Sequence, residues 1–226
     1  MAKRALIAWS SGKDSAWSLH ILRRDPDVEV AGLFTTVNRV DERVAVHAVR
    51  DELLRVQSEA LALPLHRIPI PHPCPNENYE TAMLRLVAAA KRDGVTHLAF
   101  GDLFLEDIRS YRERIFAGVG MELLFPVWGL DTRLLAEEMT ASGVRAFIVC
   151  VDTRRAPREW AGQVFDSQFV KRMPAGIDPC GENGEFHTFA FDGPMFRHRV
   201  GARLGGIAER DGFVYADLLP DSARSR

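Results

Sequence analysis

Short apolar runs alternate along the chain with longer segments in which apolar residues recur every three or four positions. Such runs are typical of buried β-strands, and the longer period is typical of amphipathic α-helices. Strands are expected over residues 5–9, 28–35, 65–70, 95–100, 123–125 and 144–151, and helices over residues 16–22, 45–60, 83–90 and 134–140. Five or six such β-α units predict an α/β fold, a doubly wound parallel sheet with right-handed crossovers and helices on both faces.

The pattern changes after about residue 128, where the spacing becomes less regular and aromatic and glycine residues become more frequent. Residues 197–219 contain alternating stretches, and Asp211-Gly212 is a favourable hairpin turn between them. We therefore expect a larger domain over residues 1–127 and a smaller C-terminal α+β domain with short antiparallel strands over residues 128–226.

Charge and cysteine content restrict the class of protein. The net charge of the 226 residues is only −2, which gives no overall field for nucleic acid or a membrane surface, and neither partner is expected. The apolar run near the N-terminus is too short for a signal peptide or a membrane span, which predicts a cytoplasmic protein. The three cysteines, Cys74, Cys150 and Cys180, are odd in number and lack C-x-x-C spacing, so reduced thiols are expected. A homodimer is compatible with this composition, which does not fix the oligomeric state.

A polar turn follows the first expected strand and reads Ser10-Ser11-Gly12-Lys13-Asp14-Ser15. In a doubly wound sheet this turn faces the ligand crevice, and the next helix directs unpaired N–H groups toward it. Gly12 allows a phosphate to approach the backbone, Lys13 adds a positive charge, and Asp14 could cap the helix or hold a magnesium ion. The turn therefore predicts an ATP site. It is not a Walker A loop, and the simpler alternative is a solvated turn with a good helix cap.

Residues at the ends of two other expected strands should share this rim. Thr35 and Thr36 end the second strand, and Gly101 and Asp102 end the fourth. Because the carboxyl ends of parallel strands meet at one edge, we expect all four residues to contact the nucleotide.

A second glycine-rich turn lies in residues 178–188, which read DPCGENGEFHT. Glu182 and Glu185 stand three apart in it, where two carboxylates could bind magnesium or an amine, or deprotonate a nucleophile. Without other information, a charged turn that faces solvent would explain the same pattern.

Together these motifs resemble those of a known family. The first turn is similar to the PP-loop, S-G-G-K-D-S, of the N-type ATP pyrophosphatases, with Ser11 in place of the first glycine. With Gly101-Asp102, residues 124–128 (LFPVW), the second turn and residues 192–196 (DGPMF), nearly the whole chain resembles the diphthine-ammonia ligase family. Its members carry a string close to G-E-x-G-E-Y-E-T. Phe186 and His187 replace the tyrosine and glutamate here, a form similar to the bacterial branch.

The resemblance implies a Rossmann-like fold of the adenine nucleotide alpha hydrolase type and an AMP-forming amide ligase that uses ATP and Mg²⁺. ATP would adenylate a carboxylate, which in the family belongs to diphthine on elongation factor 2, and ammonia or an amine would displace AMP. Bacteria lack diphthine, so a bacterial member would use another small-molecule or protein-borne carboxylate. Residues 1–127 would bind ATP and residues 128–226 the substrate. The catalytic residues would be Lys13, Asp14, Glu182 and Glu185, and the substrate would be contacted by Gly181, Asn183, Gly184, His187 and Thr188.

Further candidates come from the residues alone. His47 and Arg50 lie near the start of the second helix, and Arg114 belongs to a Tyr-Arg-Glu-Arg run; each could contact substrate or could be an exposed helical side chain. His66, His72 and Cys74 could gather around zinc, but they lack a second spaced pair.

Two other functions use the same phosphate turn. A sensor could hold ATP without turnover, although such a protein has little use for the second turn. A PP-loop enzyme that modifies transfer RNA would need paired cysteines or a basic face, and only Cys180 stands near the second turn.

Overall fold

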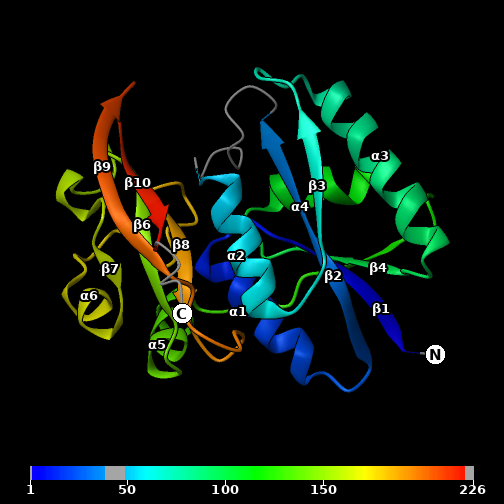
Figure 1. Cartoon of the computed structure of the whole chain (residues 1–226), viewed down its shortest axis with the longest axis horizontal. Coiled ribbons are helices and arrows are strands. Elements are labelled where there is room, and N and C mark those ends of the chain that lie inside the picture. The colour runs from blue at the N-terminus through cyan, green and yellow to red at the C-terminus, as the bar shows by residue number, and fades with distance from the viewer. Residues whose placement is uncertain (1, 39–48, 222–226) are drawn as a thin grey trace.

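The computed structural model describes residues 2–38 and 49–221, which form two β-sheets with helices between and around them (Figure 1). In chain order the elements are β1 Lys3–Ala8, α1 Lys13–Arg24, β2 Val28–Asn38, α2 Asp51–Leu61, β3 Leu65–Ile70, α3 Asn76–Arg92, β4 His97–Ala99, α4 Glu106–Ile115, β5 Glu122–Leu124, α5 Thr132–Ala141, β6 Arg145–Asp152, the short 3-10 helix η1 Arg158–Trp160, β7 Val164–Phe165, α6 Ser167–Arg172, β8 Phe186–Asp192, β9 Ala202–Arg210 and β10 Phe213–Pro220. Within the described ranges, none of the helices has both the length and the apolar character needed to cross a bilayer.

The first sheet contains five strands in the order β3-β2-β1-β4-β5, and every neighbouring pair is parallel. The chain reverses its direction of winding between β1 and β4, which is where doubly wound sheets bind ligands. Ile7 of β1 pairs with Leu33 of β2 on one side and with Ala99 of β4 on the other. The segments that leave these three strands therefore start side by side, and the predicted α/β fold is confirmed.

Helices cover both faces of this sheet. Leu6 and Ile7 are adjacent in β1, so their side chains point to opposite faces. Leu6 belongs to an apolar cluster with Met83 and Leu86 of α3, whereas Ile7 belongs to a second cluster with residues of α1 and α2. Figure 1 shows α1 and α2 between the two sheets and α3 on the outer side of the parallel sheet.

The second sheet has the order β7-β6-β10-β9, with β8 also paired to β6, and its pairs are antiparallel. The prediction that residues 144–151 add a parallel strand was wrong, because β6 lies in this second sheet. A strand buried on both faces shows the same apolar run in either kind of sheet, so the run alone does not identify its partners. The predicted hairpin is confirmed: Asp211 and Gly212 join β9 to β10 with φ angles of 53° and 80°, as a type I′ turn requires.

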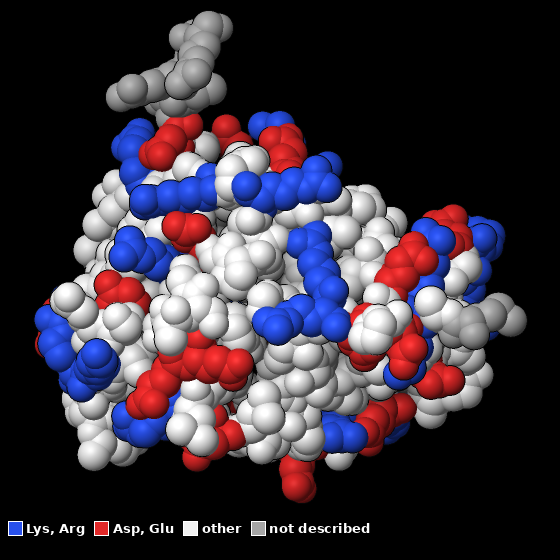
Figure 2. Space-filling model, turned by 90° about the horizontal axis from the view of Figure 1, so that it is seen from below, with Lys and Arg blue, Asp and Glu red and all other residues white. Residues whose placement is uncertain are grey.

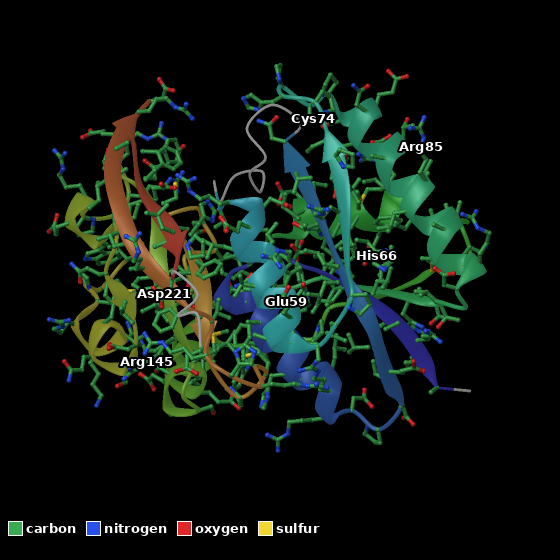
Figure 3. The ribbon with its side chains drawn as sticks, viewed as in Figure 1. Glu59, His66, Cys74, Arg85, Arg145 and Asp221 are labelled. Carbon is green, nitrogen blue, oxygen red and sulfur yellow. The ribbon has the colours of Figure 1, made fainter. Side chains whose placement is uncertain are left out.

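One apolar cluster runs across both parts of the chain. It joins Trp17 of α1 and Leu53 of α2 to Ile148, Phe189 and Val214 of the second sheet. Side chains fill the layer between these helices and that sheet (Figure 3). The predicted domain division between residues 127 and 128 stays a prediction, but the two parts share a core.

Candidate active site

A cavity of about 450 Å³ opens at the carboxyl ends of β1, β2 and β4, where residues 180–182 and 186–188 close its other side. Segments far apart in the sequence contribute to it. Of the residues predicted to be catalytic or to bind ATP or substrate, those that line it are Ser10, Lys13, Asp14, Ser15, Thr35, Thr36, Gly101, Asp102, Gly181, Glu182, His187 and Thr188.

The turn between β1 and α1 is compact and closely packed. Ser11 has a φ of 70°, in the left-handed region that glycine adopts without strain. A Cβ atom on Gly12 would lie 3.2 Å from the carbonyl oxygen of Thr188 and 3.3 Å from its hydroxyl, so a side chain there would crowd the second turn. The hydroxyls of Ser10 and Ser15 lie 3.1 Å apart, and the Lys13 N–H donates to the Thr188 hydroxyl at 3.1 Å. The phosphate turn and residue 188 thus form one wall of the cavity.

Gln57 of α2 holds this turn against β8. Its side chain is fully buried, and its Nε2 donates to the carbonyl oxygens of Ser11 at 3.0 Å and Ala190 at 2.7 Å. Its Oε1 accepts from the indole N–H of Trp9 at 2.9 Å. The Ala190 N–H also donates to the Ser11 carbonyl at 2.8 Å. Gln57 was not among the residues predicted to belong to the site, although a polar residue four positions after Leu53 on an apolar helix face was an available signal.

Lys13 places a buried positive charge at the floor of the cavity. Its side chain is 1 % exposed, and Nζ donates to both carboxylate oxygens of Asp14 at 2.9 Å and to the Cys180 carbonyl at 2.5 Å. The Phe165 and Phe186 ring centroids each lie 5.4 Å from Nζ. Burial alone would lower the pKa of Lys13, but the Asp14 carboxylate, with smaller contributions from neighbouring groups, leaves it above its usual value. Lys13 is therefore protonated at neutral pH.

Glu182 reaches the same cavity from the second turn. Its Oε1 accepts from the Leu103 N–H at 2.8 Å, and its own N–H donates to Asp178 at 2.7 Å. Burial raises the pKa of Glu182 to about 7, against the opposing effect of the Leu103 N–H, and the nearby Asp14 carboxylate adds to the rise. The carboxyl group can thus both take up and release a proton near neutral pH.

Glu185 lies behind the cavity rather than on its wall. It is 5 % exposed, and its Oε1 accepts from the Asp178 N–H and the Asn183 side-chain amide, each at 3.2 Å. These bonds close the second turn on itself. The other oxygen, Oε2, is buried without a hydrogen-bond partner among the residues that the structure describes. This placement supports a role for Glu185 in shaping the turn.

A second, more open cavity of about 620 Å³ adjoins the first, and His187 lines both of them. Asn183 and Gly184, two of the predicted substrate residues, line this second cavity. Burial and the positive charge of Lys13 lower the pKa of His187 to about 4, so its imidazole is neutral at physiological pH.

The remaining predicted substrate residues lie away from both cavities or outside the described part. Arg50 forms an ion pair with Asp217 of β10 at 2.6 Å, and Arg114 is exposed, with its guanidinium 5.0 Å from the Tyr111 ring centroid. His47 falls within residues 39–48, which the structure does not describe.

Arg112 is the arginine of α4 that lines the first cavity. Its guanidinium bonds both carboxylate oxygens of Asp102, at 2.5 and 2.9 Å, and lies 4.2 Å from the Phe100 ring centroid. Residues two apart on a helix face nearly opposite directions, and the sequence did not fix which of Arg112 and Arg114 faces inward.

The carboxylates of the cavity suit a magnesium ion only in part. Within residues 2–38 and 49–221, no three or more His, Cys, Asp or Glu side chains are grouped so that they could hold a metal ion by themselves. Magnesium bound with a nucleotide usually needs only one or two carboxylates, because phosphate oxygens and water supply the rest. Asp14 and Asp102 both line the cavity and both are already paired, Asp14 with Lys13 and Asp102 with Arg112. A magnesium ion would therefore share the Asp14 carboxylate with Lys13.

The zinc alternative finds no support in the described ranges, which hold no such group of ligands. His66 lies on β3, and Cys74 lies beyond the end of that strand (Figure 3). Burial raises the pKa of the Cys180 thiol, which disfavours the thiolate that sulfur transfer needs. Acidic and basic side chains lie among one another on the face that Figure 2 shows, and that face is not a uniformly basic surface.

Comparison with known proteins identifies relatives over most of the chain. A sequence model of the diphthamide synthase N-terminal domain matches residues 3–123, and one of the C-terminal domain matches residues 131–211. Diphthine–ammonia ligase of Bos taurus is 24 % identical over 223 residues, which cover 88 % of this chain and 82 % of the relative. The Homo sapiens protein of that name is 25 % identical with the same coverage. The Schizosaccharomyces pombe protein is 24 % identical over 84 % of this chain, which corresponds to 34 % of that longer relative.

Proposed function

The chain belongs to the diphthamide synthase family, and on that basis we propose that it is an ATP-dependent ligase that joins a substrate carboxylate to ammonia or an amine. The carboxylate oxygen attacks the α-phosphorus of ATP, and pyrophosphate leaves. Ammonia or an amine then attacks the acyl carbon of the acyl-adenylate, with release of AMP and a proton. The observation that supports this most directly is that Lys13 and Glu182, 169 positions apart, line one cavity.

The phosphate turn supplies what the first step requires. A carboxylate becomes a good acylating agent only when one of its oxygens leaves with AMP, and this in turn requires that charge on the departing pyrophosphate be stabilised. Lys13 is protonated and buried, and the hydroxyls of Ser10 and Ser15 line the same wall. A magnesium ion held by Asp14 and phosphate oxygens would supply further positive charge there.

Glu182 is the group best suited to the second step. Ammonium must lose a proton before it can attack, and a carboxylate with a pKa of about 7 accepts that proton at neutral pH more readily than an ordinary glutamate does. Glu185 would act by holding the turn that carries Glu182.

The acid that is activated need not be diphthine. His187 stands where the family string carries glutamate, and it lies where the two cavities meet. A neutral imidazole in place of a carboxylate changes both the charge and the shape of the surface that meets the acyl substrate. We therefore propose a bacterial-type member that uses another small-molecule or protein-borne carboxylate. The free cysteines fit a cytoplasmic enzyme.

The test is to incubate the purified protein with ATP, Mg²⁺, ammonium and a pool of metabolite acids, and to measure AMP, pyrophosphate and new amides by mass spectrometry. We expect AMP and pyrophosphate in equal amounts. Release of ADP and phosphate would contradict the proposal, and ATP binding without turnover would favour a sensor.

A matched pair of variants locates the reaction. Lys13→Ala should lose most of the AMP formation, because it removes the buried charge beside the phosphates, whereas Lys171→Ala on the exposed end of α6 should keep the wild-type rate. Equal rates in the wild type and Lys13→Ala would show that the phosphate turn is not the site.

A further inference from the structure

The second cavity has a cationic rim that the proposed reaction does not use. Besides His187, Asn183 and Gly184 it is lined by Asp152, Arg154, Arg155 and Phe213. Two arginines face one aspartate there, and His187 is neutral, so these groups carry a net charge of about +1 at neutral pH.

Arg154 is held in a fixed position, and Arg155 lies beside the same carboxylate. The carboxylate of Asp152 is nearly buried and accepts from Nε of Arg154 at 2.8 Å, from its Nη2 at 2.9 Å and from its backbone N–H at 3.0 Å. Nε of Arg155 lies 3.6 Å from Oδ2 of Asp152, which is beyond hydrogen-bond distance. The Arg154 guanidinium also lies 5.3 Å from the Phe213 ring centroid. The contacts of Arg154 reduce the entropy that its side chain loses when it binds an anion.

The backbone that carries the arginines is also anchored. The N–H and hydroxyl of Thr153 both donate to the Gly212 carbonyl, at 3.0 and 2.9 Å, which ties the turn after β6 to the β9–β10 hairpin. Arg154 and Arg155 nevertheless remain 67 % and 55 % exposed, so their outer N–H groups face the open cavity. A buried carboxylate would be satisfied by the bidentate contact with Arg154 alone, so Arg155 is not needed to balance its charge.

We propose that this second cavity binds an anionic group of the acyl substrate, a carboxylate or a phosphate, remote from the carboxylate that is activated. The inference rests on the proposed function, because it takes the first cavity to hold ATP and the reacting carboxylate. His187 lines both cavities, so one substrate can extend from the reaction centre past His187 to the two arginines. The substrate is therefore at least a dianion, either a dicarboxylic acid or a phosphorylated acid.

The binding test does not depend on turnover. With a non-hydrolysable ATP analogue present at saturation, the full chain is titrated by calorimetry with succinate, with inorganic phosphate and with neutral succinamide. We expect succinate or phosphate to bind with an affinity that falls with added salt, and succinamide not to bind. The tighter of the two anions identifies the kind of group. If neither anion binds the wild-type protein, or if succinamide binds equally well, the inference is wrong.

Variants assign the binding to the rim. Arg155→Gln is the main variant, because Asp152 keeps its bidentate partner and the fold should be undisturbed; we expect the anion affinity to fall about fivefold to tenfold. Arg155→Lys should retain part of it. Arg158→Gln is the matched control, since Arg158 is somewhat more exposed than Arg155 and pairs with Glu209 outside the cavity. Equal affinities in Arg155→Gln and wild type would overturn the inference.

The two proposals can fail separately. The affinity for the ATP analogue should be unchanged in each arginine variant. If the wild-type protein forms no AMP with any acid but binds the anion through Arg155, the site stands and its assignment to an acyl substrate falls. If AMP forms and Arg155→Gln leaves the KM for the acid unchanged, the ligase stands and the anion site falls.

Discussion

Replacing Gln57 by leucine should loosen the phosphate turn and destabilise the protein, because one buried side chain makes three hydrogen bonds there. Leucine fills a similar volume but leaves the indole N–H of Trp9, which is 1 % exposed, without its partner. An unsatisfied buried donor costs about 1–3 kcal/mol, and each neutral hydrogen bond contributes about 1 kcal/mol. The Ser11 carbonyl keeps the bond from Ala190, so that loss is partial. Together these give about 3 kcal/mol.

For a chain of this length about 3 kcal/mol corresponds to a fall in Tm of roughly 6–12 °C. Urea unfolding measures the free energy directly, and the KM for ATP should rise because the Ser11 carbonyl is less firmly held. Gln163→Leu is the matched control, since the Gln163 side chain is exposed and donates to the Glu159 carbonyl. It should change stability by less than about 0.5 kcal/mol. If Gln57→Leu costs less than about 1 kcal/mol, the reasoning about this residue is refuted.

Three further predictions use the two glycine-rich turns. Ser11→Gly should stabilise the protein by up to about 1 kcal/mol in urea unfolding. The change relieves the strain of a φ of 70° and removes a buried hydroxyl that has no partner among the described residues. A loss of stability would contradict this. Gly181→Ala should lower the free energy of unfolding by about 1–3 kcal/mol more than Gly184→Ala does. Both glycines have a positive φ, but only at Gly181 would the new Cβ lie 2.8 Å from the Phe186 carbonyl oxygen. Equal unfolding midpoints would refute the clash. The pKa of Glu182 is raised to about 7 from 4.5, so between these pH values the folded state holds a proton that the unfolded state releases, and the free energy of unfolding should fall as pH rises. Glu182→Gln should remove that slope. AMP formation by the wild type should fall below pH 7, because Glu182 becomes protonated there.

The phosphate turn was predictable because its chemistry is local. Gly12, Lys13 and the helix that follows are adjacent in sequence, and their position after the first strand fixes which edge of the sheet they face. Thr35 and Gly101 could be placed at the same edge for the same reason, since parallel strands align their carboxyl ends. The apolar runs gave the five parallel strands, which need only length and hydrophobicity to be recognised.

Features that depend on partners distant in sequence could not be predicted in this way. The pairing of β6 with β8 and β10 is decided by packing against residues 35 or more positions later. The inward direction of Arg112 depends on the rotation of α4 about its axis. Gln57 and Arg155 are ordinary polar residues in sequence, and only the fold brings Gln57 to the phosphate turn and Arg155 to the second cavity.

The apolar cluster that joins α1 and α2 to the second sheet limits how this enzyme can be cut or recombined. A fragment that ends near residue 127 would expose to water the faces of Trp17 and Leu53 that now contact the second sheet. Exchange of the C-terminal region between relatives would likewise require that both sides of this contact change together. New acyl specificity should therefore arise more readily by substitutions on the cavity rims than by transfer of a whole segment.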